Sequence, residues 1–253
     1  MSIIVAIFLG VVQGLTEFLP VSSSGHLILF QHIFNMDGDL LMFNIILHIA
    51  TLVAVCFVFR GQICALVRHP FKKTNACLVI ATAITCGMVV IFKDIIDRTF
   101  TYKILPFSFL ATAIILFLTN FIPRNDREVG IKTSIAVGIA QGIAVIPGLS
   151  RSGTTISTIL ATGVKRESAA TFSFLMSIPV IIASFLYEII GAVTSGDIGA
   201  IIPPIIPTAL AFVAAVISGI FAIKIMLRVI QNVKLHWFSL YLVILAVVCF
   251  VVF

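Results

Sequence analysis

The sequence predicts an all-α polytopic membrane protein, with six transmembrane helices and two re-entrant helix-loop-helix hairpins. Hydrophobic residues make up 60% of the 253 positions and charged residues only 10%, whereas soluble domains carry about 25% charged residues. Long unbroken apolar runs such as 104–122 approach the ~20 residues that a spanning helix needs. Outer-membrane barrels show short alternating segments instead. The two hairpins are expected at two similar stretches that form part of an internal repeat.

The expected elements follow one another in a regular order. The runs expected to span the membrane are 40–59, 76–92, 104–122, 169–192, 203–223 and 236–253. Two further apolar stretches, 2–19 and 131–147, each run into a Pro/Ser/Gly cluster and then a shorter, semi-polar segment. This pattern favours a hairpin that enters and leaves on one side. Residues 1–19 lack a basic start and a small-residue cleavage site, so no removable signal peptide is expected.

The two odd stretches resemble each other. "GVVQGLTEFLPVSSSG" (10–25) and "GIAQGIAVIPGLSRSG" (138–153) are identical at six of 16 positions, where chance gives about one. The chain is therefore predicted to be a single membrane domain, 1–253, made of two repeats of about 1–125 and 126–253. Because three crossings follow each hairpin, the second hairpin enters from the opposite face, and the repeats are inverted.

The two Pro/Ser/Gly loops are expected to meet near the bilayer midplane. Non-helical backbone is tolerated there only where it is buried in protein or lines a wet cavity, so a shared polar site should result. Two GxxxG patterns, Gly10–Gly14 and Gly138–Gly142, are expected to serve close helix packing.

Basic residues gather on one side of this topology. One side collects twelve: Arg60, Arg68, Lys72, Lys73, Arg124, Arg127, Lys132, Lys165, Arg166, Lys224, Arg228 and Lys234. The other side has only Lys93, Arg98 and Lys103. The positive-inside rule makes the richer side cytoplasmic and leaves both termini and the mouth of the first hairpin outside. The net charge of +6 thus reflects orientation, and no nucleic-acid binding is expected. Cys64, in a short basic loop, has no CxxC partner, and reduced structural thiols are expected throughout.

Three ionisable residues at membrane depth indicate a function. Glu17 and His26 flank the first loop, and Arg151 lies in the second. If the loops meet, a carboxylate, an imidazole, a guanidinium and several hydroxyls share one cavity. That set suits phosphate, because a guanidinium matches phosphate oxygens. Helices expected to begin near Gly25 and Gly153 would present their N-termini to the anion.

Each of these residue types also has a structural interpretation. Ser22 to Ser24 could be helix N-caps, Glu17 a structural hydrogen-bond partner, and Arg151 a snorkelling side chain. His48, apart from the two clusters, is interpreted as a packed or hydrogen-bonded histidine and not as a ligand. The duplicated context, with opposite charges in the two copies, favours function for the set.

At these residues the sequence resembles a known family. "QGLTEFLPVSSSGH" (13–26) and "PGLSRSGTTIS" (147–157) are similar to the two signature segments of the undecaprenyl-diphosphate phosphatases, the bacitracin-resistance membrane enzymes. The resemblance implies hydrolysis of undecaprenyl diphosphate to undecaprenyl phosphate in the bacterial inner membrane, which recycles the lipid carrier for cell-wall synthesis. It also implies a divalent cation, Mg²⁺ or Ca²⁺, and a fold of six spans with two re-entrant helix pairs.

The resemblance also implies roles for individual residues. Glu17 would be the metal-binding or basic carboxylate, Ser23 the nucleophile, His26 its partner or the rival nucleophile, and Arg151 the phosphate clamp. Further substrate contacts are expected from Gln13, Ser22, Ser150, Ser152, Gly153, Thr154 and Thr155. The family's first signature is (Glu or Gln)-x-x-x-Glu, and Gln13 leaves this chain without the second carboxylate that many relatives carry. Attack by water in place of a side chain stays open.

The expected partners are the lipid substrate and membrane lipid, and a homodimer is compatible with the sequence. A transporter or flippase of a lipid phosphate or anion is the alternative, because inverted repeats with broken helices also build carrier sites. The grouping of nucleophile, base and phosphate clamp favours catalysis, since a carrier needs no nucleophile.

Overall fold

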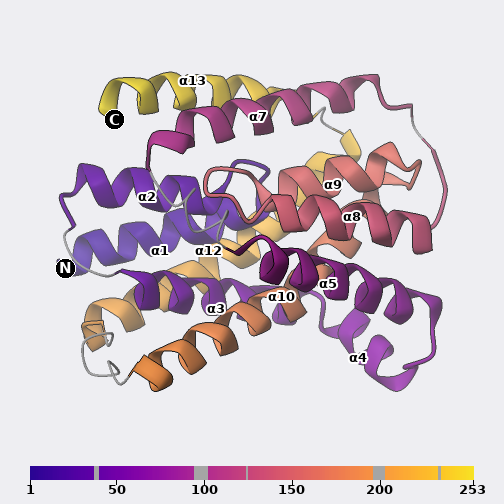
Figure 1. Cartoon of the computed structure of the whole chain (residues 1–253), viewed down its shortest axis with the longest axis horizontal. Helices are drawn as coiled ribbons and strands as arrows, with labels where there is room; N and C mark the ends of the chain where they lie inside the picture. The colour runs from indigo at the N-terminus through magenta and orange to yellow at the C-terminus, as the bar shows by residue number, and fades with distance from the viewer. Residues whose placement is uncertain (37–39, 94–101, 124, 196–202, 233–234) are drawn as a thin grey trace.

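The computed structural model (Figure 1) describes all residues except 37–39, 94–101, 124, 196–202 and 233–234. Arg98, Arg124 and Lys234 of the charge count therefore lie outside the described residues. The α-helices are α1 Ile3–Phe18, α2 Ser23–Ile33, α3 Leu41–Val58, α4 Arg60–Arg68, α5 Lys73–Ile91, α7 Leu105–Leu118, α8 Ile131–Ile143, α9 Arg151–Ala161, α10 Arg166–Ser195, α12 Ile205–Asn232 and α13 His236–Val252. Within the described residues, β-pairing is limited to one isolated bridge between Arg127 and Val164.

Five of the expected spans are helices long and apolar enough to cross a membrane, so the chain is a multi-pass membrane protein. They are Leu41–Val58, Lys73–Ile91, Tyr102–Phe121, Arg166–Gly191 and Ile205–Gln231. The last expected span, α13, is an apolar helix of 17 residues, which gives it a length of about 26 Å. Large apolar side chains on these helices point outward, including Val79, Ile217 and Val247 at 66%, 64% and 57% exposure. An acyl-chain environment accounts for such exposure, which water would penalise.

Each odd stretch forms a pair of short helices. α1 and α8 have 16 and 13 residues, and α2 and α9 have 11 each. The prediction that α2 and α9 begin near Gly25 and Gly153 was confirmed to within two residues, since they begin at Ser23 and Arg151. The helices begin earlier because the Ser22 and Ser150 hydroxyls accept the Gly25 and Gly153 N–H groups, at 3.3 and 3.0 Å. Serine side chains are strong N-caps of this kind.

Packing between the halves of the chain is reciprocal. α1 packs along α12, and α8 packs along α5. In the same way α3 contacts α12 while α10 contacts α5, and α7 pairs with α13. The contacts of α1 and α3 with α12 thus match those of α8 and α10 with α5, and α7 and α13 match each other.

The GxxxG patterns serve this packing, as predicted. A Cβ atom at Gly14 would lie 2.0 Å from Ser218 Oγ and 2.4 Å from the Ala215 carbonyl oxygen of α12. A Cβ at Gly138 would lie 2.7 Å from the Ala81 carbonyl oxygen of α5. All three separations are shorter than real Cβ contacts, so each helix reaches its neighbour only because the side chain is absent.

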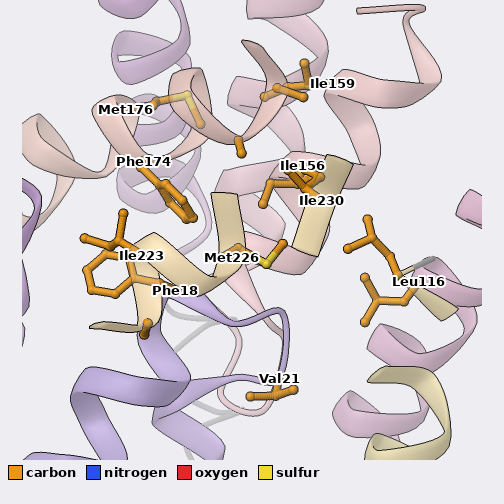
Figure 2. Packing of buried hydrophobic residues seen from close by; sticks show 14 of the residues in the cluster. Phe18, Val21, Leu116, Ile156, Ile159, Phe174, Met176, Ile223, Met226 and Ile230 are labelled. Carbon is orange, nitrogen blue, oxygen red and sulfur yellow. The ribbon is translucent and has the colours of Figure 1, made fainter. Parts of the chain in front are cut away.

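A buried apolar cluster anchors the end of α1. Phe18 is fully buried and meets Phe174 of α10 edge to face, with ring centroids 5.5 Å apart. Ile223 and Met226 of α12 belong to the same cluster (Figure 2). Because Phe18 directly follows Glu17, this packing holds the backbone from which the Glu17 carboxylate projects.

The chain termini and the segments counted as basic lie at opposite ends of the molecule, as the expected topology places them. Figure 1 shows both termini at one end, with α4 and the connection from α7 to α8 at the other. The expected loop around Cys64 is instead the helix α4, and Lys224 and Arg228 lie within α12, which continues to Asn232. Lys and Arg are good helix formers, and their long side chains can leave the apolar layer.

Candidate active site

The two loops lie in contact, as the sequence predicted. The Ser152 hydroxyl donates to the Leu19 carbonyl oxygen at 2.9 Å, and the Gly148 N–H points at Ser24 Oγ at 3.5 Å. Gly25 permits this approach, since a Cβ there would lie 2.5 Å from the Phe109 ring and 3.1 Å from the Gly148 Cα atom.

Glu17 is the centre of the polar cluster between the loops. Its side chain is only 3% exposed, and its Oε1 atom forms an ion pair with Arg151 Nη2. Its Oε2 atom accepts hydrogen bonds from Ser23 Oγ at 2.5 Å and from Gln13 Nε2 at 3.0 Å. Burial of a carboxylate is costly unless it is paired and hydrogen-bonded, and these three partners meet that requirement.

Ser23 and Arg151 reach Glu17 from equivalent places. They are 128 positions apart, the offset at which the two stretches align. Each directly follows a capping serine and opens its helix. Aligned positions of the two loops therefore deliver a hydroxyl and a guanidinium to opposite oxygens of one carboxylate.

The hydroxyl of Ser23 is placed for activation as a nucleophile. Its O–H donates to a buried carboxylate, which is the pairing that lets a serine become nucleophilic. The preceding residue, Ser22, has φ 68°, a left-handed conformation that costs energy for a residue other than glycine. Strained backbone of this kind is concentrated at functional sites.

His26 is held by two other partners. Its Nδ1 atom lies 2.7 Å from the Ser22 carbonyl oxygen, and since a carbonyl only accepts, Nδ1 carries the hydrogen. Its Nε2 atom lies 2.6 Å from the Tyr241 hydroxyl, which therefore donates. The two rings stack at an interplanar angle of 8°. The geometry thus gives Ser23 a carboxylate partner, and gives His26 a backbone carbonyl and a tyrosine.

Sequence reasoning missed Tyr241. It is a single tyrosine inside the apolar helix α13, and nothing in its local pattern distinguishes it from a residue at a membrane interface.

Arg151 has hydrogen-bonding capacity left over. Its Nη1 atom is buried and has no partner among the described residues. The hydroxyls of Thr154 and Ser157 in the same helix are also buried without one. Unsatisfied buried donors are expensive, so a ligand with several acceptor oxygens would stabilise this corner.

The other predicted contact residues are already engaged in the protein. The Ser22 and Ser150 hydroxyls cap helices, which is the structural interpretation. Thr155 Oγ1 shares a 2.6 Å hydrogen bond with Ser173 Oγ of α10. Ser152 joins the two loops, and Gly153 supplies the capped N–H. These residues build the frame around the cluster of Gln13, Glu17, Ser23 and Arg151.

His48 lies in this cluster, and the expectation that it stands apart was wrong. Its Nδ1 atom is 3.0 Å from Gln13 Nε2 and 3.4 Å from Glu17 Oε2. The prediction that it is hydrogen-bonded was confirmed. An ionisable residue in the middle of the apolar helix α3 was the available signal, but no sequence pattern ties α3 to the loop.

The residues able to hold a cation here are Glu17, Gln13 and His48. Among the described residues there is no group of three or more His, Cys, Asp or Glu side chains that could hold a metal. The Gln13 Oε1 atom, however, is buried without a partner in the described structure. Carboxylate and amide oxygens are the donors that Mg²⁺ and Ca²⁺ prefer, so the residues present fit such an ion.

Fold and site together define a class: a multi-pass helical membrane protein whose buried site combines a carboxylate, a paired serine and an arginine suited to phosphate. Comparison with known proteins makes this specific. The chain belongs to the family described as bacitracin resistance protein BacA, whose profile matches residues 6–248. The resemblance predicted from the two signature segments is thereby confirmed.

Named relatives match nearly end to end. The undecaprenyl-diphosphatase of Carboxydothermus hydrogenoformans is 40% identical over 247 residues, which cover 96% of this chain and 94% of the relative. That of Treponema denticola is 39% identical, with the same coverage. The enzyme of this name from Methanobrevibacter smithii is 37% identical over 99% of this chain and 97% of its own length.

Proposed function

We propose that this protein hydrolyses undecaprenyl diphosphate to undecaprenyl phosphate and phosphate, which recycles the lipid carrier of cell-wall synthesis and confers bacitracin resistance. The observation that carries the proposal is the buried contact of Ser23 and Arg151 with the two oxygens of Glu17. Family membership and the names of the relatives agree with it.

In the proposed first step, Ser23 Oγ attacks the terminal phosphorus as its proton passes to Glu17 Oε2, 2.5 Å away. The bond from phosphorus to the bridging oxygen breaks, and undecaprenyl phosphate leaves. Glu17 passes its proton to the leaving undecaprenyl phosphate. Water then attacks the phosphoserine and gives a proton to Glu17, the bond from phosphorus to Ser23 Oγ breaks, and Glu17 returns the proton to Oγ as phosphate is released. His26, oriented by Tyr241, would lie beside the reacting groups as a hydrogen-bonding residue.

Arg151 would hold the transferred phosphoryl group through the Nη1 atom that has no protein partner in the described structure. Catalysis of phosphoryl transfer depends mainly on such positioning and charge stabilisation. We also propose a divalent cation, Mg²⁺ or Ca²⁺, held by Glu17 and by the free carbonyl oxygen of Gln13. When bound, it would neutralise charge on the diphosphate.

We further propose six spans, with α13 as the last, and two re-entrant pairs, α1–α2 and α8–α9, in inverted repeats of about 1–125 and 126–253. The reciprocal helix packing supports this arrangement. So does the length of α2 and α9, about 17 Å each, against the ~30 Å of the hydrocarbon core. The protein would lie in the bacterial inner membrane with both termini and the site mouth outside.

The test is phosphate release from undecaprenyl diphosphate by purified protein in detergent, with and without Mg²⁺. Ser23→Ala and Arg151→Ala should abolish release, while the exposed Ser184→Ala and Arg68→Ala should not. A phosphoserine trapped at Ser23 by rapid acid quench would distinguish serine attack from direct attack by water. Lipid translocation in vesicles without any phosphate release would instead establish the carrier alternative.

A further inference from the structure

We propose that residues 60–73, which comprise α4 and its connection to α5, bind anionic phospholipid headgroups at the membrane surface. This segment is named the interfacial anchor. It lies at the end of the molecule opposite the termini (Figure 1), and its lipid binding does not depend on the proposed phosphatase reaction.

The interfacial anchor joins the ends of two membrane-crossing helices. α3 ends at Val58 and α5 begins at Lys73, and both helices are long and apolar enough to cross a membrane. Because consecutive crossing helices are joined on one face of the bilayer, the segment between them lies at the level of the lipid headgroups.

The interfacial anchor is basic and has no acidic residue. It carries Arg60, Arg68, Lys72 and Lys73, whereas the whole stretch 40–93 contains neither Asp nor Glu. All four basic side chains are exposed. Each Lys or Arg near an anionic membrane surface strengthens the attraction roughly fivefold. The charge of the segment is therefore complementary to anionic headgroups.

Two large apolar side chains lie among these charges. Phe71 is 101% exposed and Val67 is 75% exposed, while Ile63 and Leu66 of the same segment pack against the core cluster. In water, such exposure of a phenylalanine is unfavourable. Amphipathic segments rich in Lys and Arg bury apolar side chains of this kind just beneath the headgroups. The outward surface thus matches the lipid interface in both charge and polarity.

An ordered connection presents Phe71. The Asn75 Nδ2 atom donates at 2.9, 2.9 and 3.0 Å to the carbonyl oxygens of Leu66, His69 and Pro70. The Asn75 side chain therefore ties the last turn of α4 and the bend that follows it to the first turn of α5. Because the connection is already ordered, little conformational entropy is lost when Phe71 enters the lipid.

An acidic protein is the competing occupant of such a surface. The position of the segment favours lipid, because headgroups surround the ends of α3 and α5 in any bilayer. Anionic phospholipids also satisfy both features of the surface at once, since the headgroup pairs with the cations and the upper acyl chain receives the apolar side chains.

The test is quenching of tryptophan fluorescence by brominated lipids. The chain contains a single tryptophan, Trp237, so reporters are placed in a Trp237→Phe background. Phe71→Trp reports on the interfacial anchor. Ile4→Trp is the matched control, because Ile4 is 81% exposed in α1 and residues 1–16 carry no charged side chain. Each protein is reconstituted in vesicles of phosphatidylcholine and phosphatidylglycerol, with the same molar fraction of one lipid or the other brominated.

Brominated phosphatidylglycerol should quench the Phe71→Trp reporter at least about twofold more than brominated phosphatidylcholine does. The two lipids should quench the Ile4→Trp reporter equally. The combined changes Arg68→Gln, Lys72→Gln and Lys73→Gln should remove the preference at the first reporter, and high salt should reduce it. Unchanged quenching of the Ile4→Trp reporter in the same triple variant shows that the protein is still inserted and folded.

Arg127→Gln with Lys132→Gln is the control for charge removal elsewhere. Both residues are exposed and lie outside the interfacial anchor, so the preference should persist. Equal quenching of the Phe71→Trp reporter by the two lipids, or a preference that survives the three glutamines, overturns the inference. A Phe71→Trp reporter that neither lipid quenches also overturns it, and would place the segment in water as a docking surface for protein.

Discussion

Replacement of Arg151 by lysine separates the two tasks proposed for the guanidinium. Arg151 uses Nη2 for Glu17 and keeps Nη1, buried and unpartnered within the described structure, for a phosphate oxygen. Lysine keeps the charge but concentrates it on one nitrogen, without the planar fork. Only one of the two tasks can then be met with good geometry.

The expected loss of kcat/KM corresponds to the loss of one charge-assisted hydrogen bond. Such a bond contributes about 1.5–3 kcal/mol, which corresponds to roughly a 10- to 150-fold fall in kcat/KM. Arg151→Ala should cost more and also destabilise the fold by about 3–5 kcal/mol, because it leaves the buried Glu17 carboxylate without its counter-charge.

The assay is steady-state phosphate release, combined with chemical unfolding of the same samples in detergent. Arg151→Lys should retain near wild-type stability while losing activity, and Arg68→Lys at an exposed position of α4 should alter neither. Activity of Arg151→Lys within threefold of wild type would refute the two-task assignment. An Arg151→Ala protein as stable as wild type would refute the pairing argument.

Three other changes test neighbouring parts of the structure. Glu17→Gln removes the acceptor for the Ser23 hydroxyl and should lower kcat about 10²- to 10⁴-fold. Phosphate release at a saturating substrate concentration measures kcat. An unchanged kcat would contradict the assignment of Glu17 as the base. Tyr241→Phe removes the hydroxyl that donates to His26. It should lower kcat/KM up to about tenfold, the equivalent of one hydrogen bond of about 0.5–1.5 kcal/mol. An unaltered kcat/KM would show that His26 needs no such partner. Gly14→Ala places a methyl group 2.0 Å from Ser218 Oγ and should destabilise by about 1–3 kcal/mol. Gly61→Ala, with open space around it, is the control for unfolding, and equal effects would contradict the packing argument.

The sequence was informative wherever a local pattern carried the physics. Apolar runs predicted the spans, and the GxxxG patterns predicted close helix packing, which the structure shows between α1 and α12 and between α8 and α5. Glu17 and Arg151 were expected to approach each other because inverted repeats would bring their two loops together near the bilayer midplane. Each inference used the residue's own neighbours or its copy in the other stretch.

The missed residues depend on contacts between segments that share no pattern. His48 joins Glu17 only because α3 packs beside α1, and Tyr241 joins His26 across 215 positions of chain. Both residues lie outside the two aligned stretches, 10–25 and 138–153. The helix starts were predicted to within two residues, and the serine hydroxyl three positions before each glycine makes the cap.

The comparison of the two loops explains how one scaffold yields an asymmetric site. The residues common to both copies are structural: the serines cap helices and the glycines allow close helix packing in each half. The residues with proposed roles in the reaction lie where the two copies differ. Glu17 corresponds to Val145, and Ser23 corresponds to Arg151. A symmetric pair of loops would bring like groups together, two carboxylates or two guanidinium ions, which repel at low dielectric. Divergence at these two positions instead leaves one carboxylate between a hydroxyl and a guanidinium, so the site needs both copies and neither loop could form it alone.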